Sequence, residues 1–472
     1  MRAFHKPRAR DVATLLGALV ALSGCVAEDA GYQDVRKVVA SRTGHEVRWQ
    51  HVDGDKSARA VRELLAQPLT TESAVKLALL NNADLQAGFE ELGIARADLM
   101  SALRLPNPVA EGSVRFHENE GTTLDLSVTE DLSQLLFLPL RNSAARAELE
   151  AATLSVATRA MDLVLEVRTA FYAYLADQQA LDFRRTVLQA LEASAEVATA
   201  LHDAGNVTDL NFESEQVLEQ EARVSFASAK AALATSRERL NALLGLWGDG
   251  ANWRTEARLD APAEDVPVAS LEAKAIERSL DLGIIRKRFV AAARRANLAR
   301  AEGWLPELKG GVTAERESDG WSYGPLAELQ VPLFYQGQGE VARARAEMRR
   351  ERQLLGAREV QIRAAARATA TKLSAARDRA LFIKNVLLPS RERILNATQL
   401  QFNGMGVSVF QLLMAKRDQV ETAKNYVEAL RDYWTAYAEF QQLRSGRLPR
   451  GSVFDVNGWQ LGSPSRLVSD GH

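Results

Sequence analysis

The side chains that could carry out chemistry in this chain of 472 residues do not fall into a catalytic or metal-binding pattern. Cys25 is the only cysteine, which excludes an intramolecular disulfide and leaves no thiolate set for a structural zinc ion. Serine and aspartate are abundant, but no nucleophile elbow or triad-like cluster occurs. The six histidines show no ligand spacing: His5, His45, His51, His117, His202 and His472. We therefore predict that the protein is not an enzyme and has no catalytic residue, no metal and no cofactor.

One glycine-containing motif imitates a dinucleotide-binding loop. The run Gly337-Gln338-Gly339-Glu340 follows a predicted strand and opens a predicted helix, as such a loop would. A Rossmann unit would return to a parallel strand within about 30 residues. The next strong break in this sequence is at Gly404, so we reject nucleotide binding.

The composition favours long helices and argues against a nucleic-acid partner. Charged residues make up 25% of the chain and the formal net charge is −2, so there is no basic excess to neutralise phosphates. Aromatic residues are only 6%, and alanine, leucine, glutamate and arginine dominate. The length exceeds what one hydrophobic core normally organises, which predicts several domains or an elongated shape.

Two stretches alternate between small or apolar residues and polar residues, which is the period of a β-strand. The first comprises residues 110–117 and 124–129 around the polar turn Glu118-Asn119-Glu120-Gly121. The second is Leu308–Phe334, with alternating arms at 308–315 and 327–331. Arms of about 9–11 residues are long enough to cross a bilayer as tilted strands. We predict two β-hairpins, although a soluble sheet would show the same alternation.

Long helices are predicted around these hairpins. Helices over residues 69–103 and 268–303 end before Pro106 and Pro306, because proline cannot continue a helix. Helices over 142–204 and 341–403 follow the hairpins, and at about 1.5 Å per residue the first would be roughly 90 Å long. Breaks at Gly205 and Gly404 are followed by return helices whose apolar residues have the 3-4 spacing of a coiled-coil seam.

The same order of elements therefore occurs twice. Pro106 corresponds to Pro306 at an offset of 200 residues, and Gly205 to Gly404 at an offset of 199, which indicates internal duplication. We predict a lipoprotein signal peptide (1–24), a lipid-anchored N-terminal tether (25–68), a first repeat (69–250), a linker (251–267), a second repeat (268–446) and a C-terminal tail (447–472).

The N-terminus resembles the signal peptide of a bacterial lipoprotein. A basic start is followed by the apolar run Val12–Leu22, which is too short to span a bilayer and ends in Leu22-Ser23-Gly24-Cys25. This run is similar to the lipobox, which implies cleavage before Cys25 and attachment of lipid, including palmitate, to that residue. The alternatives are an ordinary signal peptide and a chance cysteine. We expect the polar residues that follow Cys25 to form an extended tether.

Four strands in one chain cannot by themselves form a stable membrane structure. An open sheet in lipid leaves the backbone groups at its edges unpaired, at a cost of several kcal/mol each. The smallest bacterial barrels have about eight strands. If the hairpins cross a membrane, they must therefore combine with strands from other copies of the chain.

Over about residues 69–445 the sequence resembles the TolC-like outer-membrane efflux family, including its lipoprotein members. Asn82-Ala83 departs from the usual Asn-Pro of that family, which concerns only the start of one helix. The motifs that carry the resemblance are Leu77-Ala78-Leu79-Leu80-Asn81-Asn82, Leu92-Gly93-Ile94-Ala95-Arg96-Ala97-Asp98-Leu99, Leu105-Pro106-Asn107-Pro108, Gly205-Asn206-Val207-Thr208-Asp209-Leu210, Val331-Pro332-Leu333-Phe334, and Phe402-Asn403-Gly404-Met405 with Val409-Phe410-Gln411-Leu412-Leu413.

The resemblance implies an α+β membrane protein that forms a homotrimer. Its twelve strands would close one β-barrel in the outer membrane, continued by an α-helical coiled-coil barrel in the periplasm. The tips of the helical hairpins would dock onto a periplasmic adaptor protein, which connects the channel to an inner-membrane pump. Asp209 is the candidate for an acidic ring at the periplasmic aperture. The implied docking residues are Gly205, Val207, Thr208 and Leu210 in the first tip, and Gly404, Val407 and Ser408 in the second.

The function predicted from this resemblance is a passive conduit that exports small molecules, either drugs or metal ions, across the periplasm and the outer membrane. The expected location is the bacterial outer membrane, with a lipid anchor and a periplasmic helical domain. Two alternatives stay open at this point. One is the channel of a type I protein-secretion system, and the other is a coiled-coil lipoprotein scaffold without a pore.

Overall fold

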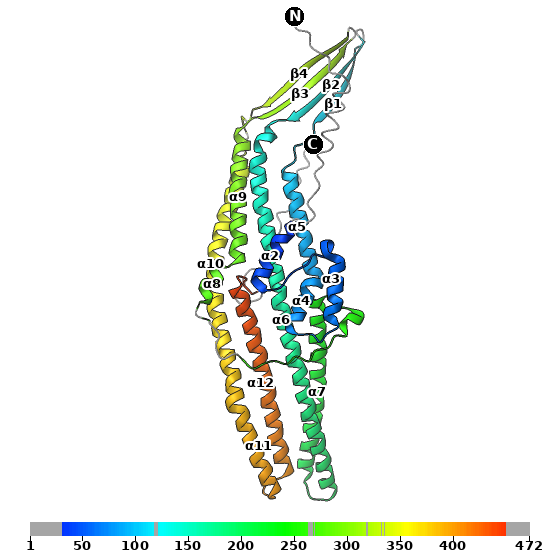
Figure 1. Ribbon diagram of the computed structural model, residues 1–472, viewed down its shortest axis with the longest axis vertical. Helices are drawn as coiled ribbons and strands as arrows, with labels where there is room; N and C mark the ends of the chain where they lie inside the picture. Colours follow the sequence, from blue (N-terminus) through cyan, green and yellow to red (C-terminus); the bar gives the residue numbers. More distant parts are fainter. Residues whose placement is uncertain are drawn as a thin grey trace.

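The computed structural model describes residues 31–449, apart from 118–120, 263–267, 269, 318–319, 332 and 335. The molecule is elongated: a four-stranded sheet stands at one end, a helical body fills the middle, and two helical hairpins reach the opposite end (Figure 1). In the described part of the chain, no helix combines the length and the apolar character that crossing a membrane requires.

The region predicted as an extended tether contains two helices, over residues 32–43 and 50–65, so that prediction is wrong there. Helix α2 spans Tyr32–Thr43 and α3 spans Gln50–Leu65. Tyr32, Val35 and Val39 recur at helical spacing and are buried in the main hydrophobic core. The Tyr32 hydroxyl donates a hydrogen bond to the Val47 carbonyl oxygen at 3.0 Å, which ties the segment between the two helices to α2.

The first half begins with two helices where one was predicted. Helix α4 spans Thr71–Asn81 and α5 spans Ala83–Ala102. Asn82 between them has extended backbone angles, and its side chain accepts a hydrogen bond from the Leu85 amide. The chain therefore starts a new helix at Asn82 with an N-cap, without the proline that the family usually has next.

The first hairpin and the first pair of long helices follow. Strands β1 (Val109–His117) and β2 (Gly121–Asp131) lead into α6 (Ser133–Asp203), which begins nine residues before the predicted start and contains Pro139 within its first turns. The return helix α7 spans Asp209–Leu244 and is followed by the short 3₁₀ helix η1 (Gly248–Ala251). The apolar residues of α7 that have the 3-4 spacing, from Ala222 to Leu243, are less exposed than the residues on the opposite side of the helix. Among them, Leu240 is fully buried.

The second half has the same order of elements. Helices α8 (Leu271–Glu277) and α9 (Leu280–Trp304) are separated at Ser279, whose hydroxyl caps α9 as Asn82 caps α5. Strands β3 (Glu307–Glu317) and β4 (Gly320–Gln330) follow, then α10 (Gln338–Phe382), a π-helical segment η2 (Ile383–Leu387), α11 (Leu388–Asn403) and α12 (Val409–Arg444). The π-helical segment lies just before Pro389, which lacks the amide that a regular α-helix would use.

One antiparallel sheet joins the two halves. Its strand order is β1-β2-β3-β4, so the two hairpins pair with each other through β2 and β3. Leu126 in β2 faces Gly112 in β1 and Ala314 in β3, and Ala314 faces Tyr323 in β4. This register places the residues of one parity from all four strands on the same face.

A buried ion pair network holds the halves together in the middle of the body. Arg447, just after α12, contacts Asp162 of α6 at 2.8 Å and also contacts Asp281 of α9. Gln442 donates a second hydrogen bond to Asp162 at 2.9 Å. Both aspartates are almost completely buried, so these partners offset the cost of removing their charges from water.

Candidate functional site

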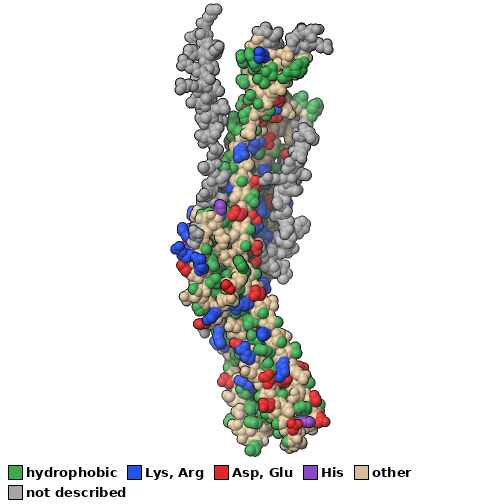
Figure 2. Space-filling model, turned by 90° about the vertical axis from the view of Figure 1, so that its right-hand side faces the viewer, with side chains coloured by type: hydrophobic (Ala, Val, Ile, Leu, Met, Phe, Trp, Pro, Cys, Tyr) green, Lys and Arg blue, Asp and Glu red, His purple; other side chains and the backbone are tan. Residues whose placement is uncertain are grey.

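The sheet has an apolar face that no other layer of the described structure covers (Figure 1). Val312 in the centre of the sheet is 62% exposed, and Phe116 and Tyr323 are 83% and 77% exposed. A soluble protein would bury such a patch or bind something with it. Figure 2 shows hydrophobic side chains at this end of the molecule. The polar residues Thr122, Glu130 and Arg316 lie towards the ends of the strands on the same face. The small and apolar residues of the face are Ala110, Gly112, Val114 and Phe116 in β1, Leu124, Leu126 and Val128 in β2, Leu308, Gly310, Val312 and Ala314 in β3, and Trp321, Tyr323, Pro325, Ala327 and Leu329 in β4.

The opposite face of the sheet is polar and carries a network of ion pairs. Arg115 in β1 contacts Asp125 in β2 at 2.6 Å and Glu315 in β3 at 3.5 Å. Lys309 in β3 lies 3.6 Å from Glu328 in β4. The sheet is therefore apolar on one side and charged on the other, which is the pattern expected where one face meets lipid and the other meets water.

The two outer strands have one partner each. Within the described residues, β1 pairs only with β2, and β4 pairs only with β3. The outer edges of β1 and β4 thus present unpaired backbone groups, which is the arrangement from which one sheet extends into another.

Both predicted docking tips lie together at the end of the molecule opposite the sheet (Figure 1). In the first tip, the Gly205 amide donates to the His202 carbonyl and the Asn206 amide donates to the Leu201 carbonyl, each at 2.8 Å. Thr208 caps α7 by accepting a hydrogen bond from the Asn211 amide. Val207 is half-buried against the hairpin, whereas Leu210 is 76% exposed.

The second tip repeats these hydrogen bonds at an offset of 200 residues. The Met405 amide donates to the Phe402 carbonyl at 2.9 Å, and the Gly406 amide donates to the Gln401 carbonyl at 2.8 Å. Ser408 caps α12 and forms a reciprocal capping box with Gln411. Val407 is half-buried, as Val207 is in the first tip.

The predicted pairing of Gly205 with Gly404 is therefore wrong by one residue. Gly205 has a left-handed backbone with φ 70°, and the residue in the same conformation in the second tip is Met405, with φ 59°. Gly404 has φ −86°, which any residue can adopt. Gly205 and Gly404 were paired because both are glycines that interrupt a long helix. The hydrogen bonds and backbone angles instead match Gly205 with Met405.

The first tip contains an ion pair that the second lacks. His202 Nε2 lies 2.9 Å from Asp209 Oδ1, and the imidazole ring stacks on Phe212 with ring centroids 4.6 Å apart. Asp209, the aperture candidate, is thus tied to its own hairpin, and its side chain is almost fully exposed. Its role in an aperture stays a prediction.

The docking candidates came from the family resemblance, and Met405 was not among them. It is 95% exposed at the end of the second tip and is the one described residue other than glycine with a positive φ. Its position could have been found by keeping the 200-residue offset of Pro106 and Pro306 through the tips.

Cys25 lies outside the described residues, so its predicted lipid attachment stays a prediction.

The comparisons with known proteins agree with this architecture. Residues 75–246, which include β1, β2, α6 and the first tip, match the family model described as outer membrane efflux protein. This segment belongs to the outer membrane efflux protein family. Across most of its length the chain is also 24% identical to the cobalt-zinc-cadmium resistance protein CzcC of Cupriavidus metallidurans, with 378 residues aligned that cover 77% of this chain and 87% of that protein.

Solved structures of membrane proteins share the fold of this chain. A membrane protein of Pseudomonas aeruginosa is superimposed with a TM-score of 0.67 at 19% identity, covering 84% of this chain and 92% of that one. The open state of the MtrE outer membrane channel of Neisseria gonorrhoeae gives the same TM-score at 16% identity, covering 80% and 90%. The predicted TolC-like fold is confirmed by these matches.

Proposed function

We propose that three copies of this chain form the outer-membrane channel of a tripartite efflux pump. The four strands of each copy would contribute to one closed barrel of twelve strands, and the helical hairpins would form a periplasmic tunnel. The channel would be passive, with transport driven by an inner-membrane pump through an adaptor bound at the tips. The repeated order of elements would have arisen by internal duplication.

The observation that carries this proposal is the two-faced sheet with unpaired edges. Its apolar face suits lipid, and its ion-paired face suits a water-filled interior. In a closed barrel, β1 of one copy would pair with β4 of the next, which satisfies the edge strands that a single copy leaves open. The direction of the two tips, away from the sheet, is consistent with contact to a periplasmic partner.

We further propose that Cys25 carries the lipid anchor and that the exported cargo is divalent metal ions. The lipobox-like sequence supports the anchor, and mass spectrometry of the mature N-terminal peptide tests it. The similarity to the cobalt-zinc-cadmium resistance protein CzcC supports the cargo. Deletion of the gene is expected to lower tolerance of cobalt, zinc and cadmium salts, while tolerance of organic drugs stays unchanged; the opposite result would assign the channel to drug efflux.

The assembly is tested by the native mass of the protein extracted from outer membranes in detergent, with the detergent mass subtracted. The expected value is three chains, falling to one on boiling. A monomer, or release of the protein from the membrane once its lipid is removed, would leave the tethered scaffold as the better interpretation.

The sheet faces are tested by a matched pair of neighbouring substitutions in β3. Val312→Arg places a cation on the apolar face, where a charge near the bilayer midplane costs about 2–4 kcal/mol. Thr313→Arg places the same cation on the polar face, near Glu315 of the same strand. We expect the first variant to lose trimer assembly in outer membranes and the second to retain it. Equal assembly of both would contradict the assignment of the faces.

A further inference from the structure

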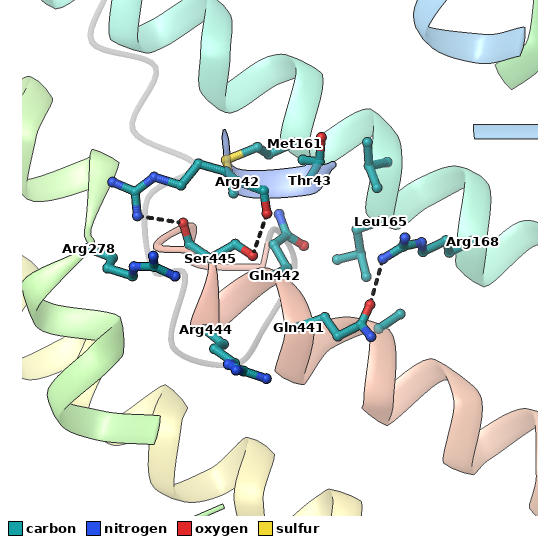
Figure 3. Close-up of a pocket in the computed structure, with 12 residues that line it drawn as sticks. Arg42, Thr43, Met161, Leu165, Arg168, Arg278, Gln441, Gln442, Arg444 and Ser445 are labelled. Carbon is teal, nitrogen blue, oxygen red and sulfur yellow. Dashed lines mark hydrogen bonds between the residues drawn. The ribbon is translucent and has the colours of Figure 1, made fainter. Parts of the chain in front are cut away.

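A cavity of about 360 Å³ lies in the middle of the helical body, away from both the sheet and the tips. It lies where the end of α2, the middle of α6, the end of α12 and the turn between α8 and α9 meet (Figure 3). Among its twelve lining residues there are four arginines and no carboxylate. The arginines are Arg42, Arg168, Arg278 and Arg444.

One of the four arginines has a partner that balances its charge. Arg168 donates to Gln441 Oε1 at 2.6 Å and lies 3.3 Å from the carboxylate of Glu72. The imidazole of His45, 2.8 Å from that carboxylate, lowers the pKa of Glu72, and the charge of Arg168 lowers it further against the opposite effect of burial. Glu72 is thus held in its ionised form beside Arg168.

The other three arginines have no ion-pair partner within the described structure. Arg42 donates to the carbonyl oxygen of Ser445 at 3.2 Å, which contributes no negative charge. No ion pair joins Arg278 or Arg444 to a carboxylate among the described residues. Figure 3 shows Arg42 and Arg278 on either side of Ser445. Burial, and then the charge of Arg278, lowers the pKa of Arg42, because like charges share a partly desolvated space.

A larger cavity in the same molecule is lined by charges of both signs. The space of about 770 Å³ between α5, α6, α9 and α10 is lined by five arginines and five carboxylates. There Arg295 lies 2.5 Å from Glu148 and Arg343 lies 3.3 Å from Glu347. Arginines and carboxylates therefore line the larger cavity in equal number, whereas the charged residues that line the smaller cavity are all arginines.

We propose that the cavity is a binding site for a small polyvalent oxyanion of the phosphate or carboxylate class. Guanidinium groups present several N–H donors in a plane, a geometry that suits the oxygens of these anions. An anion bound there would contact arginines from α2, α12 and the α8–α9 turn at once. It would thus fasten the N-terminal helix to both halves of the body. This site does not depend on the proposed transport function.

The proposal is tested by isothermal titration calorimetry on the mature full-length protein in a phosphate-free detergent, at constant ionic strength in chloride. Inorganic phosphate and succinate, added separately, distinguish the two oxyanion sources. The expected result is saturable binding of one anion per chain to the cavity and a rise in the thermal unfolding temperature. Heats no larger than those of added chloride would overturn the proposal.

Matched arginine variants locate the site. Arg278→Gln and Arg444→Gln remove exposed side chains that have no described carboxylate partner, so the fold is expected to be unchanged by circular dichroism. Each should weaken anion binding by about tenfold or more. Arg286→Gln, an exposed arginine on α9 away from the cavity, is the control and should bind as the unmodified protein does. Equal affinity in all three variants would place the anion elsewhere and refute the site.

A double variant tests whether carboxylates of the chain itself occupy the cavity. In the full-length chain, Asp455→Asn combined with Asp470→Asn removes the acidic side chains that follow Arg447. Unchanged phosphate affinity supports a free ligand. Binding that appears only in this double variant would mean that the C-terminal segment fills the cavity, and would overturn the proposal of a free oxyanion.

Discussion

The two hairpin tips have the same backbone and different side chains. Both turns form the same hydrogen bonds, 200 residues apart, and both end in a hydroxyl N-cap followed by a return helix. The first tip puts glycine at the left-handed position and adds the His202–Asp209 ion pair. The second puts Met405 at that position and has no charged pair. One tip is relaxed and polar, whereas the other is strained and apolar.

The different side chains at the left-handed position indicate that the two tips meet different requirements. A left-handed conformation costs a residue other than glycine about 1–2 kcal/mol, so a methionine there is unfavourable for the turn itself. Its side chain makes no compensating contact that would bury it, since it is 95% exposed. A residue that is unfavourable for folding and points into solvent suggests a role in contact with another protein.

The largest expected effect comes from exchanging the residues at the left-handed position. Gly205→Met should lower the local stability of the first tip by about 1–2 kcal/mol, and Met405→Gly should raise that of the second by a similar amount. Hydrogen exchange of the Asn206 and Gly406 amides measures both, with faster exchange in the first variant and slower exchange in the second. Changes of the same sign at the two tips would show that the turns are not equivalent.

The next effect separates docking from stability. Under the proposed function, Met405→Gly is expected to weaken binding of the purified protein to the proposed adaptor by about tenfold, which corresponds to roughly 1.4 kcal/mol, although the tip itself becomes more stable. Surface plasmon resonance with the purified protein provides the affinity. Met405→Leu is the control, because it keeps an apolar side chain and should bind nearly as the unmodified protein does. Unchanged binding of the glycine variant would remove Met405 from the interface.

The smallest effect concerns the ion pair of the first tip. In a buffer acidic enough to protonate the imidazole, Asp209→Asn should destabilise that tip by only a few tenths of a kcal/mol, because the pair is exposed to solvent and screened by salt. Hydrogen exchange at low and high salt is the measurement, and the effect should fade as salt is added. Asp203→Asn, whose carboxylate lies 4.0 Å from the same ring, is the weaker control. A salt-independent loss would point to the N-cap region of α7 instead of the ion pair.

The local signals of the sequence were enough to predict most of the helices and strands. Prolines at 106 and 306 marked the ends of α5 and α9, and strict alternation marked the strands, because these patterns follow from the period of each element. The same reasoning failed at residues 32–65. There the few apolar residues, such as Val35 and Val39, lie within a polar segment, and their burial depends on a distant part of the body.

The tips, the central cavity and the sheet were only partly predictable, because they too depend on contacts between residues far apart in the sequence. The positions of the tips followed from glycine breaks in long helices, but the equivalence of Gly205 and Met405 depends on hydrogen bonds that residue type does not reveal. The arginines of the central cavity are far apart in the sequence, from Arg42 to Arg444, and no spacing rule connects them. Pairing of β2 with β3 is equally non-local, so the sequence could indicate two hairpins but not their order in one sheet.

The pairing of β2 with β3 also bears on the order in which the chain folds. Thr313 of β3 donates a hydrogen bond to the Leu126 carbonyl of β2 across 187 residues of sequence. Helices α6 and α7, in contrast, meet across a short turn and can associate early. Because closing a long loop costs entropy that only later contacts repay, we expect the sheet to assemble after the helical hairpins. The apolar sheet face, which is the surface most prone to aggregate in water, is then completed last.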